Sequence, residues 1–358
     1  MRAFKALLFV LGAGLLGVLV YRVGPEPILQ ALNRLTWWQC ILVCLPYAFS
    51  AALDTLGWRF AFARDRAPFW RLYGARLAGE SLNLVAAVGP VPGEAAKAWL
   101  VRRDVSYAES VPSVVIAKTT ITIAQALFLL IGLVLAWHTL PLGSDLLRAM
   151  LWLLAAEIIG VAGFVWAQVT GVVGRAGRLL RLVGVSGSTE YAESLDRALR
   201  HYYSREWRRL GLSIGFHLLG WLVAPLETII VLWALGVDAS IGTAIVIETL
   251  GSGIRFATFL IPASLGALEA ANAAAFAALG FGAGTGLAFT FIRRARQAVW
   301  IAIGIVVLMA MRWTSSRAVD PGSPSTAPSG AGADHPELSG PGRRMSDVPL
   351  NADERTSP

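Results

Sequence analysis

Long apolar runs constrain this chain more than any other feature. A helix needs about 20 residues to cross roughly 30 Å of hydrocarbon. Six runs reach that length: Phe4–Tyr21, Trp38–Phe62, Pro112–Trp137, Leu147–Val169, Leu210–Leu235 and Ala288–Met311. Only 15% of the residues are charged, against about 25% in a soluble domain. We therefore expect an all-α integral membrane protein with about six transmembrane helices.

Two further apolar stretches contain residues that interrupt a helix. Residues 77–96 include VGPVPG at 88–93, and residues 241–271 include GSG at 251–253 and IPASLG at 261–266. Proline removes a backbone donor, and glycine loosens a helix. Irregular backbone is tolerated at membrane depth only where protein or a wet cavity surrounds it. Both stretches are therefore predicted to be re-entrant broken helices.

The basic residues predict the topology, because cytoplasmic loops carry an excess of Lys and Arg. Segment 171–209 has eight arginines against four acidic residues, whereas connections 138–146 and 236–242 have no Lys or Arg. The Arg-rich loop is therefore expected in the cytoplasm. With six crossings, both termini are expected there too, in a multi-pass protein of a bacterial inner membrane.

The same pattern predicts the domain organisation. Residues 1–311 are expected to form a membrane domain with halves at about 38–137 and 210–311. Residues 312–358 are rich in Pro, Ser, Gly and Asp and are expected to be a disordered cytoplasmic tail. Within the Arg-rich loop, residues 191–207 are expected to form a short amphipathic helix against anionic lipid.

The charged residues of the two halves follow the same order. The corresponding pairs are Asp54 and Glu227, Glu80 and Glu248, Glu94 and Glu269, and Lys118 and Arg293. The charge topology gives the two halves opposite orientations. Inverted halves, each with an interrupted helix, are the architecture of many secondary transporters, and the interruptions indicate the binding site. We therefore expect an inverted repeat.

Charged and polar residues inside these apolar stretches are the candidate substrate-binding residues. An ionised side chain at bilayer depth costs about 2.5–3.5 kcal/mol, so it requires a partner, a cavity or a function. Arg and Lys suit a lipid phosphate, while carboxylates can pair with them, accept protons or bond head-group amines and hydroxyls. The candidates are Glu80, Asn83, Glu94, Lys118, Glu248, Arg255, Glu269, Arg293, Arg294 and Arg296.

Simpler roles compete with substrate binding at several of these positions. Arg293, Arg294 and Arg296 lie near the start of the last crossing, where long side chains can reach back to the interface. Glu94 and Glu269 follow the breaks, where a helix dipole favours a carboxylate in the first turn.

Other ionisable residues do not indicate a cofactor. Asp54 and Glu157 are expected in interhelical hydrogen bonds, with a proton relay as the alternative. The four histidines are scattered singly, so no metal or cofactor is expected. The basic residues lie in short clusters between apolar runs, which argues against nucleic-acid binding. The chain has no Gly-Lys-Ser/Thr phosphate loop to support ATP use.

Four short sequences carry a resemblance to a known family. They are GESLN and PGEAAK within Arg76–Leu100, the stretch Pro262–Glu269, and RRARQ at 293–297. There the chain resembles the flippase-like membrane family named after the transmembrane region of lysylphosphatidylglycerol synthase, over about residues 5–311. The resemblance implies two re-entrant segments in an inverted arrangement. In the named member it implies translocation of an aminoacylated phospholipid, and other members are associated with hopanoid synthesis.

The sequence departs from the synthase in ways that bear on function. Only the tail follows Met311, so aminoacyl-transferase activity is not expected, and Lys97 stands where relatives usually have arginine. The resemblance therefore implies a non-enzymatic lipid translocase that binds anionic or aminoacylated phospholipid head groups between two broken helices. The alternatives are an accessory protein or enzyme of hopanoid or polyprenyl-lipid biosynthesis, and a scaffold for lipid-modifying partners. The expected partners are membrane lipids and enzymes of lipid biosynthesis.

Overall fold

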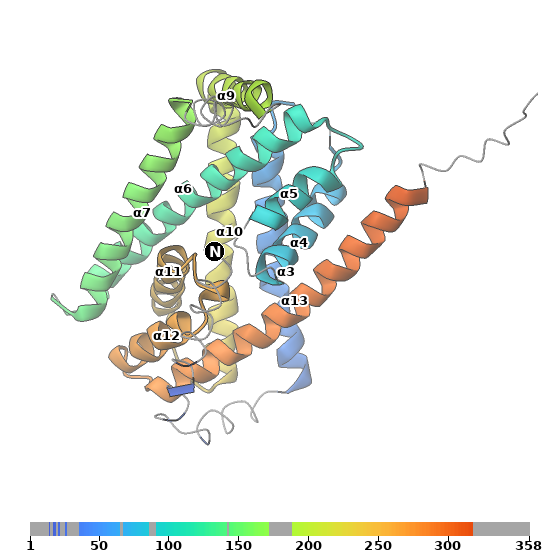
Figure 1. The fold of residues 1–358 in the computed structure, drawn as a ribbon. Coiled ribbons are helices and arrows are strands. Elements are labelled where there is room, and N and C mark those ends of the chain that lie inside the picture. Colours follow the sequence, from blue (N-terminus) through green and yellow to red (C-terminus); the bar gives the residue numbers. More distant parts are fainter. Residues whose placement is uncertain are drawn as a thin grey trace, which may run out of the picture. The chain divides into compact units, whose positions relative to one another are not determined.

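The described part of the chain folds into a series of helices, as shown by a computed structural model (Figure 1). The structure describes residues 36–64, 67–85, 91–141, 143–171 and 188–317, with five single positions before residue 27. The helices are α3 (Trp37–Ala61), α4 (Phe69–Val85), α5 (Val91–Leu100), α6 (Tyr107–Thr139), α7 (Asp145–Val169), α9 (Ser188–Arg205), α10 (Trp207–Ala234), α11 (Ile241–Ala257), the short 3₁₀ helix η1 (Pro262–Ser264), α12 (Ala267–Ala278) and α13 (Ala283–Arg317). Within the described ranges there is no strand, which confirms the all-α class.

Five of the described helices are long and apolar enough to cross a membrane, namely α3, α6, α7, α10 and α13. They correspond to five of the six predicted crossings, and the first, Phe4–Tyr21, lies almost entirely outside the described residues. The outer face of α7 leaves Trp152 77% exposed and Ile159 73% exposed. An exterior of uncovered apolar side chains is stable in lipid rather than in water. The chain is therefore a multi-pass membrane protein.

The two predicted interruptions are present as pairs of short helices. Helix α4 ends at Val85 and α5 begins at Val91, on the two sides of residues 86–90, which lie outside the described residues. Helix α11 ends at Ala257 and α12 begins at Ala267, with η1 between them.

One detail of the second stretch differs from the sequence expectation. Helix α11 continues through Gly251-Ser252-Gly253 without a break. The small residue at Gly253 instead allows α7 to approach, because a Cβ there would lie 3.1 Å from Leu153 Cδ1. Small residues commonly permit such close helix packing in membranes.

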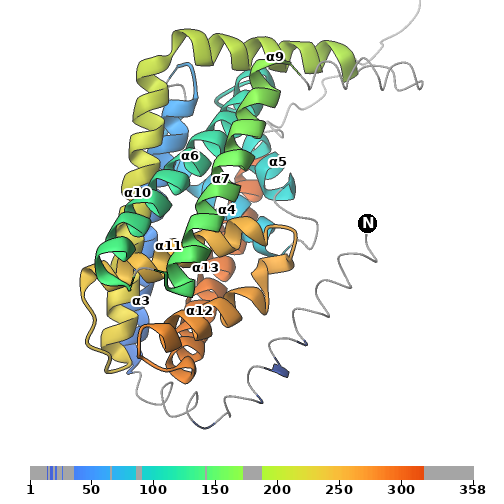
Figure 2. The same cartoon turned by 90° about the vertical axis from the view of Figure 1, so that its left-hand side faces the viewer.

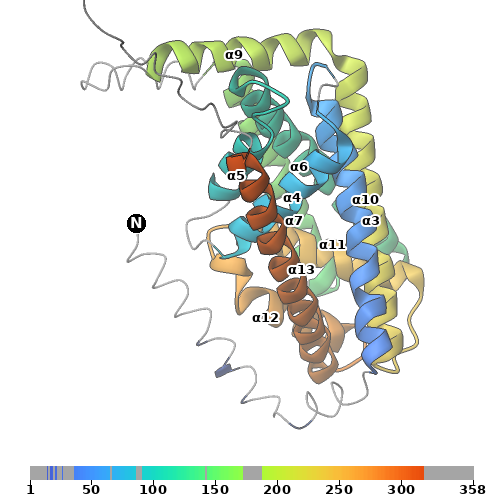
Figure 3. The same cartoon turned by 90° about the vertical axis from the view of Figure 1, so that its right-hand side faces the viewer.

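The elements follow the same order twice. A long helix, a 17-residue helix, a short helix and a second long helix occur as α3–α6 and again as α10–α13. Helices α3 and α10 lie side by side and run in opposite directions, and α6 and α13 also run in opposite directions (Figures 1 and 3). The α4–α5 pair lies toward the end that carries α9, and α12 lies toward the other end (Figure 2). Corresponding helices of the two series therefore run in opposite directions, as the predicted inverted repeat requires.

Helix α9 crosses the end of α6, α7 and α10, where the sequence predicts a surface helix (Figure 2). Tyr202 donates its hydroxyl to the Phe60 carbonyl and Tyr203 donates to Gln168 Oε1, each at 2.7 Å. Burial raises the pKa of both tyrosines, so their hydroxyls stay protonated and act as donors. These two bonds fix α9 to the ends of α3 and α7.

Candidate functional site

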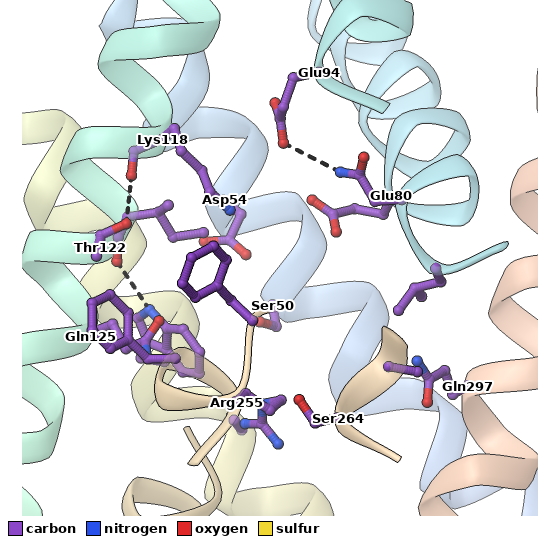
Figure 4. Close-up of a pocket in the computed structure, with 18 of the residues that line it drawn as sticks. Ser50, Asp54, Glu80, Glu94, Lys118, Thr122, Gln125, Arg255, Ser264 and Gln297 are labelled. Carbon is purple, nitrogen blue, oxygen red and sulfur yellow. Dashed lines mark hydrogen bonds between the residues drawn. The ribbon is translucent and has the colours of Figure 1, made fainter. Parts of the chain in front are cut away.

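A cavity of about 1180 Å³ opens between the two sets of helices. The long helices supply its walls, the α4–α5 pair reaches it from one end, and the segment between α11 and α12 reaches it from the other. Figure 4 shows Lys118, Glu80 and Arg255 around this common space. Charged side chains are expensive in apolar surroundings, so their concentration on one cavity indicates a binding site.

One group of charges, here called the α4–α5 cluster, comprises Asp54, Arg76, Glu80, Glu94 and Lys97. Arg76 Nη2 lies 2.6 Å from Asp54 Oδ2, and Arg76 Nη1 lies 3.9 Å from Glu80 Oε1. Lys97 Nζ lies 3.0 Å from Glu80 Oε1 and 3.1 Å from Glu94 Oε1. Charges of alternating sign therefore connect α3 to both short helices.

Close backbone contact between α4 and α5 positions this cluster. The Gly93 N–H donates to Asn83 Oδ1 at 2.8 Å, and Asn83 Nδ2 donates to Glu94 Oε1 at 3.3 Å. A Cβ on Gly93 would overlap the Gly79 carbonyl oxygen, and a Cβ on Gly79 would lie 2.6 Å from Lys97 Cγ. A larger residue at either glycine would push α5 away from α4 and separate Lys97 from its carboxylate partners.

His217 joins the α4–α5 cluster from α10. Its Nδ1 lies 2.8 Å from Asp54 Oδ1, and its side chain is 1% exposed. Asp54 thus has partners on two other helices, as the sequence predicted for an interhelical hydrogen bond.

A second group, here called the α11–α13 cluster, comprises Glu227, Glu248, Arg255, Arg293 and Arg296. Arg293 Nε lies 3.1 Å from Glu227 Oε1, and its Nη1 bonds Glu248 Oε2. Arg255 Nη2 lies 3.1 Å from Glu248 Oε1, and Arg296 Nε lies 3.0 Å from Glu227 Oε1. The planar guanidinium fork of Arg293 therefore connects α13 to both α10 and α11.

Arg294 holds the interrupted segment between α11 and α12. Its Nε donates to Glu269 Oε1 and its Nη1 donates to the Ala263 carbonyl, both at 2.9 Å. Ala263 and Ser264 have φ of 52° and 51°, a left-handed conformation that residues with side chains adopt only when their surroundings impose it. Glu269 also accepts the Gly266 N–H at 2.7 Å. Arg294 and Glu269 together stabilise the shape of the interruption.

Lys118 is the exception among the cations of the cavity. It is exposed to the cavity, and its ammonium forms no hydrogen bond or ion pair with another described residue. The charged groups of the two clusters, with Lys118, Arg294 and Glu269, number seven cations and six carboxylates within the described residues. Each of these carboxylates has an Arg or Lys partner, whereas Lys118 forms no ion pair with a described residue, so its ammonium is available to an added anion.

The prediction that Glu157 forms an interhelical hydrogen bond was wrong. Its side chain is fully buried in the middle of α7, yet neither carboxylate oxygen has a hydrogen-bond partner among the described residues. The spacing of residues along α7 shows that Glu157 faces the protein, but it does not reveal which groups the neighbouring helices present.

The structure brings the ten candidate residues together. Nine of them line the cavity, and Glu269 lies behind Arg294. Arg293, Arg294 and Arg296 bind carboxylates inside the protein, with side chains 15%, 21% and 12% exposed, rather than reaching for an interface. Glu94 and Glu269 lie in the first turns of their helices, as the helix-dipole interpretation predicts, and each is also ion-paired within the protein.

The comparison with known families agrees with this arrangement. The family described as "Lysylphosphatidylglycerol synthase TM region" matches residues 5–313. The chain belongs to this family. The match includes the five candidate membrane spans and both interrupted helix pairs, so this is a lipid-related membrane protein and the resemblance seen in the sequence is confirmed. No curated relative and no solved structure matches the chain closely enough to add to that assignment.

Four residues of the two clusters were not among the predicted substrate-binding residues: Asp54, Arg76, Lys97 and Glu227. The correspondence between Asp54 and Glu227 in the two halves was a signal for both. Arg76 and Lys97 lie near the ends of an apolar stretch, where a basic residue usually marks the cytoplasmic side, so their positions alone did not indicate a place in the site.

Proposed function

We propose that this protein moves a phospholipid with an anionic head group across the bilayer, and that the head group passes through the cavity between the two clusters. The observation that carries the proposal is Lys118, an unpaired ammonium exposed to the cavity of a lipid-related membrane protein. A lipid phosphate would supply the missing partner through a charge-assisted hydrogen bond.

The inverted arrangement supports movement rather than simple binding. In secondary transporters with inverted repeats, the substrate site lies at interrupted helices, and one repeat rocks against the other around it. Here the α4–α5 pair and the α11–α12 interruption, which we take to be re-entrant, contribute to the same cavity from different ends. A head group in contact with both could be released to either side as the two halves move.

The cavity also suits an amphiphile. Val91, Phe259 and Leu260 belong to its lining and are 70%, 63% and 54% exposed. Apolar side chains at an open rim can contact acyl chains while the charged interior binds the head group.

The charge balance favours an anionic head group over an aminoacylated one. An added lysyl or alanyl ammonium would need a carboxylate. The five carboxylates of the two clusters and Glu269 each already have an Arg or Lys partner. Binding such a cation would require breaking a shielded ion pair, whereas binding a phosphate at Lys118 breaks none. We therefore place phosphatidylglycerol-like lipids ahead of their aminoacylated derivatives.

We also propose that the protein is not an enzyme. The carboxylates that line the cavity are each ion-paired with Arg or Lys, which leaves them poorly placed to act as a general acid or base. Among the described residues no group of three His, Cys, Asp or Glu side chains is placed to hold a metal ion. The remaining alternative is an accessory role in hopanoid or polyprenyl-lipid synthesis.

A reconstitution experiment tests the proposal. Purified protein in liposomes would be assayed with fluorescent phosphatidylglycerol and fluorescent phosphatidylcholine, scored by accessibility to a membrane-impermeant reductant. Lys118→Gln removes one charge-assisted hydrogen bond of about 1.5–3 kcal/mol, so transfer of phosphatidylglycerol should require roughly ten to a hundred times more lipid. Lys118→Arg should retain most of the transfer, because the charge is kept.

Arg148→Gln is the matched control. Arg148 lies on α7 outside the cavity, pairs with Asp145 and has a side chain 64% exposed. Loss of that charge should leave transfer unchanged. If Lys118→Gln transfers each lipid as well as wild type does, at equal incorporation, the head-group role of Lys118 is refuted. Wild-type protein that transfers neither lipid would instead favour the accessory role.

A further inference from the structure

A second ionisable feature lies outside both clusters. Glu157 is the 13th of the 25 residues of α7, its exposure is 0%, and within the part of the chain that the structure describes both of its oxygens lack a partner. Burying a polar group without a hydrogen bond is unfavourable, and burying an unpaired carboxylate ion is far more so. An ionisable residue kept at such a position inside a membrane protein indicates a function.

The contacts of α7 locate this side chain relative to the cavity. Helix α7 packs against α6 and α11. Leu153 and Gly160 lie four residues before and three residues after Glu157, so they share its helical face. Leu153 packs beside Gly253, and a Cβ on Gly160 would lie 2.8 Å from Phe256 Cζ. Glu157 therefore faces the stretch of α11 between these two contacts.

That position is one turn away from the cavity wall. Gly160, Val161 and Phe164 line the cavity from α7, and Phe256 lines it from α11. Glu157 does not line the cavity itself. A small separation of α7 from α11 at Gly160 and Phe256 would expose the carboxyl group to the water of the cavity.

The charged groups on the helices that pack against α7 either have other partners, face the cavity or lie far from Glu157 along their helix. On α11, Glu248 binds Arg293 and Arg255. On α6, Lys118 faces the cavity, and Glu109 and His138 lie at the two ends. On α9, Asp196 and Arg200 lie beside Gly171, beyond the end of α7, and α7 itself has Asp145 and Arg148 in its first turn. None of these groups forms an ion pair with Glu157, so protonation is what neutralises it.

We propose that Glu157 is a proton-binding site that couples lipid movement to the proton gradient. In the packed state the carboxyl group keeps its proton. When α7 and α11 separate, the O–H bond breaks, the proton passes to water in the cavity, and the carboxylate is hydrated. Reprotonation from the other side of the membrane allows the helices to pack again. The coupling rests on the proposed translocation, whereas proton binding at Glu157 does not.

Infrared difference spectroscopy tests proton binding by itself. Wild-type protein should show the carbonyl band of a protonated carboxylic acid at neutral pH, and Glu157→Gln should lack it. Asp145→Asn is the matched control, because it replaces a carboxylate on the same helix whose side chain is 94% exposed, and it should keep the band. Glu157→Asp retains the acid and should shift the band, which provides the readout if the glutamine variant does not fold. A band unchanged in both Glu157 variants would overturn the proposal.

Transport assays then test coupling. In proteoliposomes, wild-type lipid transfer should respond to an imposed pH gradient. Glu157→Gln should retain transfer without a gradient but lose the response to it, because an amide mimics the neutral acid permanently. An equal gradient response in wild type and Glu157→Gln would overturn the coupling. Failure of lipid transfer in all variants would count against the proposed function, while the infrared band would still decide whether Glu157 binds a proton.

Discussion

Arg294→Gln should destabilise the protein strongly, in contrast to Lys118→Gln. Arg294 binds Glu269, whose side chain is 1% exposed, and the carbonyl of Ala263 in the left-handed part of the interruption. Removing one partner of a buried ion pair leaves an uncompensated charge and costs about 3–5 kcal/mol. That is a change of roughly a hundred- to several-thousand-fold in the folding equilibrium. Lys118 has no partner to leave behind, so its replacement should cost less than about 1 kcal/mol.

Unfolding in detergent measures the difference, with folded protein recorded by size-exclusion chromatography after heating. Arg294→Gln should lose its folded peak at a clearly lower temperature than wild type, and Lys118→Gln should match wild type. The double change Arg294→Gln with Glu269→Gln should recover part of the loss, because no buried carboxylate is then left unpaired. Equal stability of the two single variants would refute the division of cations into structural and substrate-binding groups. So would a double variant that is no more stable than Arg294→Gln.

Two further predictions concern the interruptions and the topology. Gly93→Leu should abolish transfer and lower stability, because its side chain would overlap the backbone of α4, and wild-type transfer would contradict the close contact. Gly266→Leu should also lower stability and transfer, because Gly266 has a φ of 78°, a conformation that costs a residue with a side chain roughly 1–2 kcal/mol. The same heating assay would measure the loss of stability. Cysteine tags in spheroplasts should report the cytoplasm at Ser188 and the periplasm at Gly143 and Asp238. External labelling at Ser188 would reverse the proposed orientation.

Several features followed from the sequence because they depend on local composition. Apolar runs of membrane-spanning length identified the five described crossings, since lipid requires each of them to satisfy its own backbone hydrogen bonds. The prolines and glycines at 88–93 predicted the first interruption, because they remove donors and permit close backbone contact. The order of charges along the two halves suggested the repeat and most of the charged residues that line the cavity.

The tertiary structure alone decided what each charge does. Arg293 and Arg294 are adjacent in the sequence, yet Arg293 binds glutamates on α10 and α11 while Arg294 supports the interruption before α12. Among the described residues, Lys118 remains without an ion-pair partner, and Glu157 is buried without a hydrogen-bond partner. An ion pair or a hydrogen bond requires two groups within about 3–4 Å. Here the partners lie on different helices, so the packing of those helices determines which charges meet, and helical periodicity specifies only the face on which each one lies.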